Sequence, residues 1–292
     1  MKFDNYFEIG TSHEVCQDYA LTGAINDNIA YAIVADGCTM SHKECGQVDL
    51  GARILAHSAK DTLNRIFGDQ AHIKTNDDDA SALNRFFREK AIITTHMIER
   101  QIDLPPLFAD CTLLAAVVDS RKRADIYMYG DGNVFVKLDT GNFVIVDITF
   151  LSSAPFYLSY HTDPPRKRAY IEEFGEAPIL IDTYVYTEDG ELETKNAQQT
   201  TAKEGNLYDK TTFTFDSVEF LSLMSDGVKS FLKQEESGFN PVDYLEVIRD
   251  FNNLKNKNGV FVQRRMKSVA KRHKKANITH YDDISVASVI TE

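Results

Sequence analysis

Cysteine is scarce in this sequence and forms no recognisable pattern. The four cysteines, at positions 16, 38, 45 and 111, include no Cys-x-x-Cys pair and no dense framework. A zinc knuckle and a disulfide scaffold are therefore not expected. Reduced thiols that take part in packing are the default expectation.

Long apolar runs are also missing. The longest apolar stretches, such as residues 112–118, fall far short of a membrane span. The N-terminal sequence MKFDNYFEIG lacks the basic and apolar regions of a secretory signal. These absences predict a soluble protein of the cytoplasm that has no membrane partner.

Positive charge is in deficit, with 32 lysines and arginines against 44 aspartates and glutamates and a formal net charge of -12. Because nucleic-acid backbones attract basic surfaces, this balance argues against a nucleic-acid partner. The one basic block is QRRMKSVAKRHKK, residues 263–275, where apolar residues recur at helical spacing. Two interpretations stay open: an amphipathic helix with a solvated basic face, and a docking surface for an acidic or phosphorylated partner.

The sequence does contain enough apolar residues for a substantial core, since 43% of its 292 residues are hydrophobic. Residues 151–215 differ from the rest: they are rich in proline and charge, and they predict an irregular excursion. The order of the remaining elements predicts an α+β layered domain with an antiparallel sheet. The predicted strands are 6–10, 18–24, 29–36, 111–119, 124–130, 134–138, 143–150, 218–226 and 284–290.

Helical periodicity appears in four places. Residues 46–67 carry an apolar stripe, and further helices are predicted around 241–252 and from about residue 259. The predicted helix at 80–101 has an apolar stripe made of Leu83, Phe86, Phe87, Ile93 and Met97.

Aspartates stand at the ends of several predicted strands. Asp18 begins one strand of a predicted hairpin and Asp36 ends the next, so the two should be neighbours at one edge of the sheet. Antiparallel pairing would bring other strand-end aspartates to the same rim. The predicted cluster consists of Asp18, Asp36, Asp131, Asp226, Asp282 and Asp283.

The alternative interpretation is that these aspartates belong to ordinary turns. A single Asp-Gly pair is more typical of a turn than of a ligand, and Asp189-Gly190 needs no other function. Asp36, Asp131 and Asp226 are set apart because no return strand is expected directly after them, as a hairpin would require.

A carboxylate cluster of this kind requires cations, because like charges at close range raise one another's pKa. Oxygen ligands without histidine or cysteine neighbours favour Mg²⁺ or Mn²⁺. Two such ions about 3.5–4 Å apart, bridged by one aspartate, would hold a water and neutralise a phosphoryl group under attack. The cluster therefore predicts phosphate hydrolysis.

Six short motifs follow one another along the chain: CQDYA, VADGCTMSHKECGQVDLGARILA, TLLAAVV, YGDGNVF, LMSDGV and YDDISVASV. Their order and spacing resemble those of the metal-dependent protein phosphatases of the phosphatase 2C type. The resemblance implies one catalytic domain over residues 1–292, with a flap-like insertion at about 151–215. It also implies a four-layer αββα sandwich, whose two central antiparallel sheets are flanked by helices, and a dinuclear Mn²⁺ or Mg²⁺ centre at one edge.

The resemblance assigns four metal ligands. Asp36 matches the bridging ligand, and the carbonyl of Gly37 matches a ligand of the second ion. Asp226 and Asp282 match the remaining ligands of the first ion.

Three further aspartates have assigned or expected roles. Asp18 matches the acidic residue that holds metal-bound waters. Asp131 matches the aspartate that, with Asp226, completes a third metal site in bacterial members. Asp283 stands where many members have asparagine, so a supporting role is expected.

Several positions depart from the family pattern. His13 falls where an arginine usually grips the substrate phosphate, and imidazole is a weaker, pH-dependent substitute that remains a candidate catalytic residue. Gln17 replaces an acidic residue and offers only a neutral oxygen. Cys38 occupies the place of a general-acid histidine, so no side-chain acid is expected there. His42 is expected to be an exposed loop histidine.

The leading hypothesis is hydrolysis of phosphoserine and phosphothreonine by a metal-activated water, with a phosphorylated protein as substrate and a cognate serine/threonine kinase as a further partner. No Cys-x5-Arg signature is present, which disfavours cysteine-based chemistry. Two alternatives stay open: a catalytically weak pseudophosphatase that acts as a regulatory binding module, and a hydrolase of small phosphate monoesters. In the 151–215 segment, Arg166, Lys167 and Arg168 either form part of a solvated loop or guide a phosphoprotein to the metals.

Overall fold

The computed structural model describes residues 1–38, 50–73, 77–152, 154–175, 179–201 and 210–291. Its helices are α1 (Leu50–Phe67), α2 (Asp77–Gln101), α3 (Pro164–Phe174), α5 (Tyr244–Asn252) and α6 (Phe261–Lys275), with short 3-10 helices η1 (Pro106–Ala109), η2 (Leu158–His161) and η3 (Asp226–Lys229). Its strands are β1 (Lys2–Glu8), β2 (Tyr19–Asn26), β3 (Ile29–Gly37), β4 (Cys111–Asp119), β5 (Ala124–Tyr129), β6 (Gly132–Leu138), β7 (Phe143–Phe150), β8 (Ile179–Tyr186), β9 (Leu192–Thr200), β10 (Thr212–Phe215), β11 (Val218–Met224), β12 (Phe231–Glu235), β13 (Gly238–Pro241), β14 (Ile278–His280) and β15 (Ile284–Ile290).

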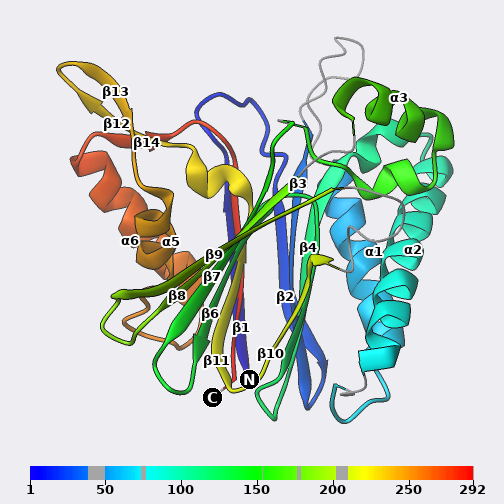
Figure 1. Cartoon of the computed structure of the whole chain (residues 1–292), viewed down its shortest axis with the longest axis horizontal. Coiled ribbons are helices and arrows are strands. Elements are labelled where there is room, and N and C mark those ends of the chain that lie inside the picture. Colours follow the sequence, from blue (N-terminus) through cyan, green and yellow to red (C-terminus); the bar gives the residue numbers. More distant parts are fainter. Residues whose placement is uncertain (39–49, 74–76, 153, 176–178, 202–209, 292) are drawn as a thin grey trace.

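Two antiparallel sheets form the centre of the molecule (Figure 1). The larger has seven strands in the order β1-β15-β11-β6-β7-β8-β9, and the smaller has five in the order β10-β5-β4-β3-β2. A third, small sheet in the order β13-β12-β14 lies beside α6, and its β12–β13 hairpin projects away from the body of the sandwich.

Helices cover the outer face of each central sheet (Figure 1). Strands β1 and β15 of the larger sheet contact β2 and β3 of the smaller one. Helix α1 packs on β2, β3 and β4, and α2 packs on α1. On the other side, α6 packs on β1 and β15, and α5 packs on α6. These layers confirm the predicted α+β fold, a four-layer αββα sandwich.

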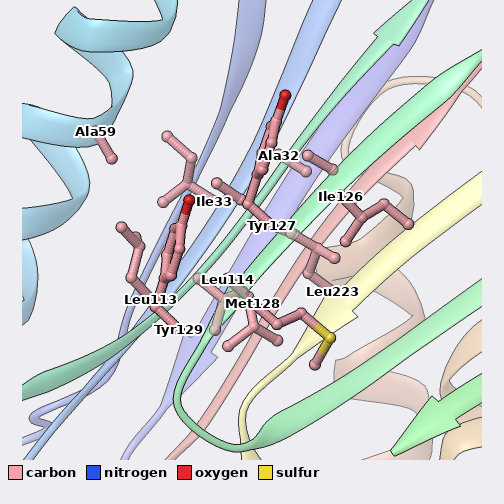
Figure 2. Close-up of a cluster of buried hydrophobic side chains, with 14 of the residues drawn as sticks. Ala32, Ile33, Ala59, Leu113, Leu114, Ile126, Tyr127, Met128, Tyr129 and Leu223 are labelled. Atoms are coloured by element: carbon pink, nitrogen blue, oxygen red, sulfur yellow. The ribbon is translucent and has the colours of Figure 1, made fainter. Parts of the chain in front are cut away.

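The main core lies between the two sheets and beneath α1. Strand β4, CTLLAAVVD, is buried along its whole length because one of its faces meets α1 and the other meets the larger sheet. Figure 2 shows Ile33 of β3, Leu113 of β4, Tyr127 of β5 and Leu223 of β11 in this core. Burying each such aliphatic side chain stabilises the fold by about 1.5–3 kcal/mol. A second core fills the space between the larger sheet and the α5–α6 pair.

A residue of strand β1 accepts hydrogen bonds from the first backbone N–H groups of helix α6. No side chain of its own caps it. Instead, Oδ2 of Asp4 in β1 accepts hydrogen bonds from the backbone N of Val262 at 2.7 Å and of Gln263 at 3.1 Å. A carboxylate at a helix N-terminus also interacts favourably with the helix dipole. Strand β1 therefore fixes where the basic helix starts.

The apolar stripe predicted for α2 was partly wrong. Phe87 is fully buried, but Phe86, Ile93 and Met97 are 46%, 45% and 56% exposed. The reason is that α2 packs on another helix, α1, and its buried side includes polar residues such as Glu99. The positions of the apolar residues alone therefore predicted the buried face of α2 incorrectly at Phe86, Ile93 and Met97.

Residues 151–215 contain more regular structure than the predicted irregular excursion. Strands β8 and β9 add two strands to the larger sheet, and β10 adds one to the smaller sheet. Strand β8, ILIDTYVY, carries a strand-like pattern that the surrounding prolines and charges obscured. Strand β9, LETKNAQQT, is almost wholly exposed and so has no apolar alternation to recognise.

Among the helices that the structure describes, none has both the length and the apolar character needed to cross a membrane.

Candidate metal centre

Two aspartates meet where the first hairpin of the smaller sheet opens. Tyr19 of β2 pairs with Ala35 of β3, which places Asp18, just before β2, beside Asp36 near the end of β3. This is the neighbourhood that the hairpin predicts. Strand β3 ends at the edge of the sandwich opposite the two chain termini (Figure 1).

Three more aspartates reach the same edge from the larger sheet. Met224, near the end of β11, pairs with Asn133 of β6 on one side and Val286 of β15 on the other. Asp226, Asp131 and Asp282 lie just beyond these paired residues. As the sequence predicts, no return strand follows Asp131. Strand β6 begins directly after it but belongs to the larger sheet, so Asp131 links the two sheets rather than turning a hairpin.

Asp36 has a carboxylate on either side. Burial raises the pKa of Asp36 well above its usual range, and the charges of Asp18 and Asp226 raise it further. Burial likewise raises the pKa of Asp18 to about 7, although the nearby hydroxyls of Ser225 and Ser285 lower it. Without cations, these carboxyls therefore hold protons at a pH where aspartate is ordinarily ionised.

The negative charge of Asp226 also raises the pKa of two other aspartates in the cluster. Burial is the main cause that raises the pKa of Asp131 to about 7, and the charge of Asp226 is the next. The pKa of Asp282 is raised by the same two causes in the same order. Lys229, three residues after Asp226, lowers the pKa of Asp131, but this lysine is itself paired with Asp147 at 2.7 Å. Lys229 was not among the residues predicted for the site, although it follows directly in the SDGVK sequence.

Two glycines let backbone segments approach closely around the cluster. A Cβ on Gly227 would lie 1.8 Å from the carbonyl oxygen of Asp283, and a Cβ on Gly37 would lie 2.9 Å from the carbonyl oxygen of Gln17. Gly37 and Gly227 are therefore required for the close packing of these backbone segments.

Asp283 ties the loop that precedes β2 to the start of β15. Its Oδ1 accepts a hydrogen bond from the backbone N of Gly10 at 2.7 Å, and its Oδ2 accepts one from the backbone N of Gln17 at 2.6 Å. His13 lies against the same group, with Nδ1 3.0 Å from Oδ1 of Asp283 and Nε2 3.7 Å from Oδ1 of Asp282. The imidazole is therefore turned toward carboxylates.

Gln17 and Cys38 lie next to Gly37 at the end of β3. Nε2 of Gln17 donates to the carbonyl oxygen of Cys38 at 3.4 Å, and the backbone N of Cys38 donates to the carbonyl oxygen of Asp110 at 3.0 Å. Burial raises the pKa of the Cys38 thiol. This thiol accordingly stays protonated at neutral pH. His42 lies outside the residues that the structure describes.

A second group borders the cluster and joins Arg166, a predicted candidate for guiding the substrate, to Asp110 and Ser159, which were not predicted for the site. The guanidinium of Arg166 in α3 pairs with Asp110, and Oγ of Ser159 donates to Asp110 at 2.5 Å. A hydrogen bond from Tyr157 and the positive charge of Arg166 both lower the pKa of the Cys38 thiol, which places them beside the end of β3. Lys167 is half-buried and Arg168 is exposed. No pattern in the sequence links Asp110 to Arg166.

The donor chemistry of the cluster fits a hard divalent cation. Asp18 is almost fully buried, yet neither of its carboxylate oxygens has a well-formed hydrogen bond. Buried oxygens without donors are what a cation would satisfy. As the side chains stand, no group of three or more His, Cys, Asp or Glu residues within the described parts of the chain converges tightly enough to hold a metal ion.

Comparisons with known proteins agree with the fold. The family model for protein phosphatase 2C matches residues 9–271. The structure of serine/threonine phosphatase Stp1 from Staphylococcus aureus covers 100% of this chain and 95% of its own, at 13% identity and a TM-score of 0.50. Serine-threonine phosphatase 2C from Toxoplasma gondii covers 99% and 94%, at 11% identity and a TM-score of 0.52. No curated protein matches. Because the family model spans most of the sequence, the chain belongs to the protein phosphatase 2C family and is an enzyme of the protein serine/threonine phosphatase class.

Proposed function

We propose that this phosphatase hydrolyses phosphoserine and phosphothreonine in proteins with the help of two Mg²⁺ or Mn²⁺ ions at the aspartate cluster. The observation that carries the proposal is the position of Asp36 between Asp18 and Asp226, with the pKa of Asp36 raised by burial and by both neighbours. Like charges this close are stable as carboxylates only with a cation between them.

This arrangement and the family pattern support the following ligand roles. Asp36 would bridge the two ions, with the carbonyl of Gly37 on the second. Asp226 and Asp282 would complete the first. Bound ions would supply a water of lowered pKa and neutralise charge on the phosphoryl group.

Other aspartates would support the centre. Asp18 would hold water within the cluster through its buried oxygens. Asp131, next to Asp226, would contribute to a third ion site. Asp283 would position the loop before β2 through its two backbone contacts.

The phosphate contact differs from the family pattern. His13 faces Asp282 and Asp283, so its imidazole is a weak phosphate ligand in this arrangement. Arg166 supplies a guanidinium near the end of β3 and suits a phosphate better, because it offers several fixed donors. Helix α3 and η2 would then border the substrate groove, as a flap does. The substrate is a phosphoprotein of the cytoplasm, and its cognate kinase is the opposing enzyme.

The proposal is tested by hydrolysis of a phosphothreonine peptide and of p-nitrophenyl phosphate while Mn²⁺ and Mg²⁺ are titrated. We expect peptide turnover that depends on metal and is lost in Asp36→Asn. The matched control is Asp189→Asn, which changes an exposed Asp-Gly turn between β8 and β9 and should leave turnover unchanged.

Other outcomes would redirect the assignment. Turnover of p-nitrophenyl phosphate alone would indicate a hydrolase of small phosphate esters. A folded wild-type protein without turnover at any metal concentration would overturn the proposal in favour of a regulatory pseudophosphatase.

A further inference from the structure

An apolar groove lies outside the metal centre, between α6 and the small β13-β12-β14 sheet. Its volume is about 650 Å³, and its lining is mostly apolar. Phe231 and Phe251 form its floor with Met266 and Val269 of α6, while Phe239 stands on the projecting β12–β13 hairpin (Figure 1).

The floor of the groove is aromatic and uncharged. The ring of Phe231 lies 5.2 Å from that of His273, 5.3 Å from that of His280 and 5.8 Å from that of Phe251. Burial lowers the pKa of His273, so its imidazole is neutral at pH 7. Phe239 is 62% exposed, which is unusual for a large apolar side chain next to an apolar groove.

One rim of the groove is basic, although the protein as a whole is acidic. Lys267, Lys271 and Lys274 are exposed and follow one another at i, i+4 and i+7, so they share one side of α6, and Lys274 lines the groove itself. Within the described residues, none of these three lysines has an ion-pair partner at 4.0 Å or less, whereas Arg265 and Arg272 of the same helix both pair with Asp250. The three charges therefore face solvent on a chain of net charge -12.

We propose that this groove is the docking site for an acidic segment of a partner protein that carries apolar anchor residues. The apolar anchors would fill the space between Phe231, Met266 and Phe239. The acidic residues would face the lysine rim of α6, and the opposite wall carries Glu8, which sets the orientation of the segment. The proposal gives a function to the basic block at residues 263–275, and binding at the groove does not depend on the proposed hydrolysis.

The groove also adjoins the aspartate cluster. Nδ1 of His280 in the groove wall donates to the carbonyl oxygen of Asp282 at 2.9 Å, and the backbone N of Thr11 donates to the carbonyl oxygen of His280 at 3.2 Å. A docked segment would therefore lie next to the loops that carry His13 and Asp282.

The test uses the full chain and a fluorescein-labelled peptide with Leu and Phe at i, i+3, i+4 and i+7 and Glu at the other positions. Fluorescence anisotropy measures its Kd. We expect the triple variant Lys267→Glu, Lys271→Glu, Lys274→Glu and the single variant Phe239→Ser each to raise Kd by about tenfold or more. The matched charge control is Arg85→Glu, Lys90→Glu, Arg100→Glu on α2, the opposite outer layer, and it should change Kd by less than about twofold.

Two comparison peptides sharpen the result. Replacing Glu by Lys in the peptide should abolish binding, and replacing Leu and Phe by Ser should weaken it as much as Phe239→Ser does. Absence of binding to the wild-type chain, or an equal loss in the α2 control, would overturn the proposal. Self-association of the wild type that Phe239→Ser abolishes would also overturn it, because the occupant would then be a second copy of the chain. Circular dichroism establishes that each variant is folded.

Discussion

The imidazole of His13 and the carboxylate of Asp283 are in contact, with Nδ1 3.0 Å from Oδ1. The same carboxylate accepts the backbone N–H groups of Gly10 and Gln17. Asp283→Ala leaves both buried donors without an acceptor and should lower the free energy of unfolding by about 2–5 kcal/mol. Asp283→Asn keeps one acceptor oxygen and should cost less, about 1–2 kcal/mol. Urea denaturation measures both, and equal losses would contradict this role.

The buried aspartates of the cluster should make the metal-free protein less stable as pH rises, which is the reverse of ordinary acid denaturation. Burial raises the pKa of Asp18 and of Asp131 from 3.8 to about 7 in the folded state. A group whose folded pKa is raised contributes its stability below its unfolded pKa and loses that stability as pH rises through the folded pKa. In EDTA, the Tm should therefore fall between about pH 4 and pH 7.

Two controls accompany that measurement. Asp18→Asn should flatten the fall, because the amide does not titrate. Added Mn²⁺ at pH 8 should raise the Tm again, because it replaces the protons. A Tm in EDTA that rises steadily from pH 4 to pH 7 would rule out this account of the cluster.

Gly227→Ala should damage the site and the fold together. The new Cβ would lie 1.8 Å from the carbonyl oxygen of Asp283, so either η3 or the start of β15 must move. We expect a loss of about 1–3 kcal/mol in unfolding free energy and weaker Mn²⁺ activation. Gly190→Asn, at an open turn with positive φ, is the comparison and should be close to neutral. A Gly227→Ala variant with unchanged Mn²⁺ dependence would show that Asp226 and Asp283 tolerate the movement.

Arg166→Ala should weaken the phosphate contact more than the chemical step. Removal of the guanidinium near the end of β3 should raise KM for the phosphothreonine peptide by about tenfold, with a smaller change in kcat. The KM of Arg166→Lys should lie between those of the wild type and Arg166→Ala, since lysine keeps the charge without the forked donors. Arg168→Ala, at an exposed position of the same helix, is the control. An unchanged KM in Arg166→Ala would return the phosphate contact to His13.

The parts of this protein that the sequence predicts well are those that carry their own periodicity. Strand β4 and the hairpin that holds Asp18 and Asp36 follow directly from apolar runs and turn residues. The family motifs add an expected role for each aspartate at this edge of the sheets.

Other parts depend on contacts that no local pattern records. Strand β9 is exposed and takes its place only by pairing with β8. The Asp110–Arg166 pair joins residues far apart in the sequence, and the orientation of His13 depends on Asp283 near the other end of the chain. Such partners can be identified only from the folded structure, in which strand pairing brings distant residues together.

The pairing of β1 with β15, in which Lys2 lies opposite Ile290, has a consequence for the order of folding. Asp18 and Asp36 leave the ribosome early, but Asp226 and Asp282, which complete the cluster with them, are synthesised near the end. The nascent chain must therefore carry an incomplete carboxylate site for most of its synthesis. Closure of the larger sheet by β15 is a contact of very long range, which slows folding, and it delays completion of the aspartate cluster until the last strand has paired.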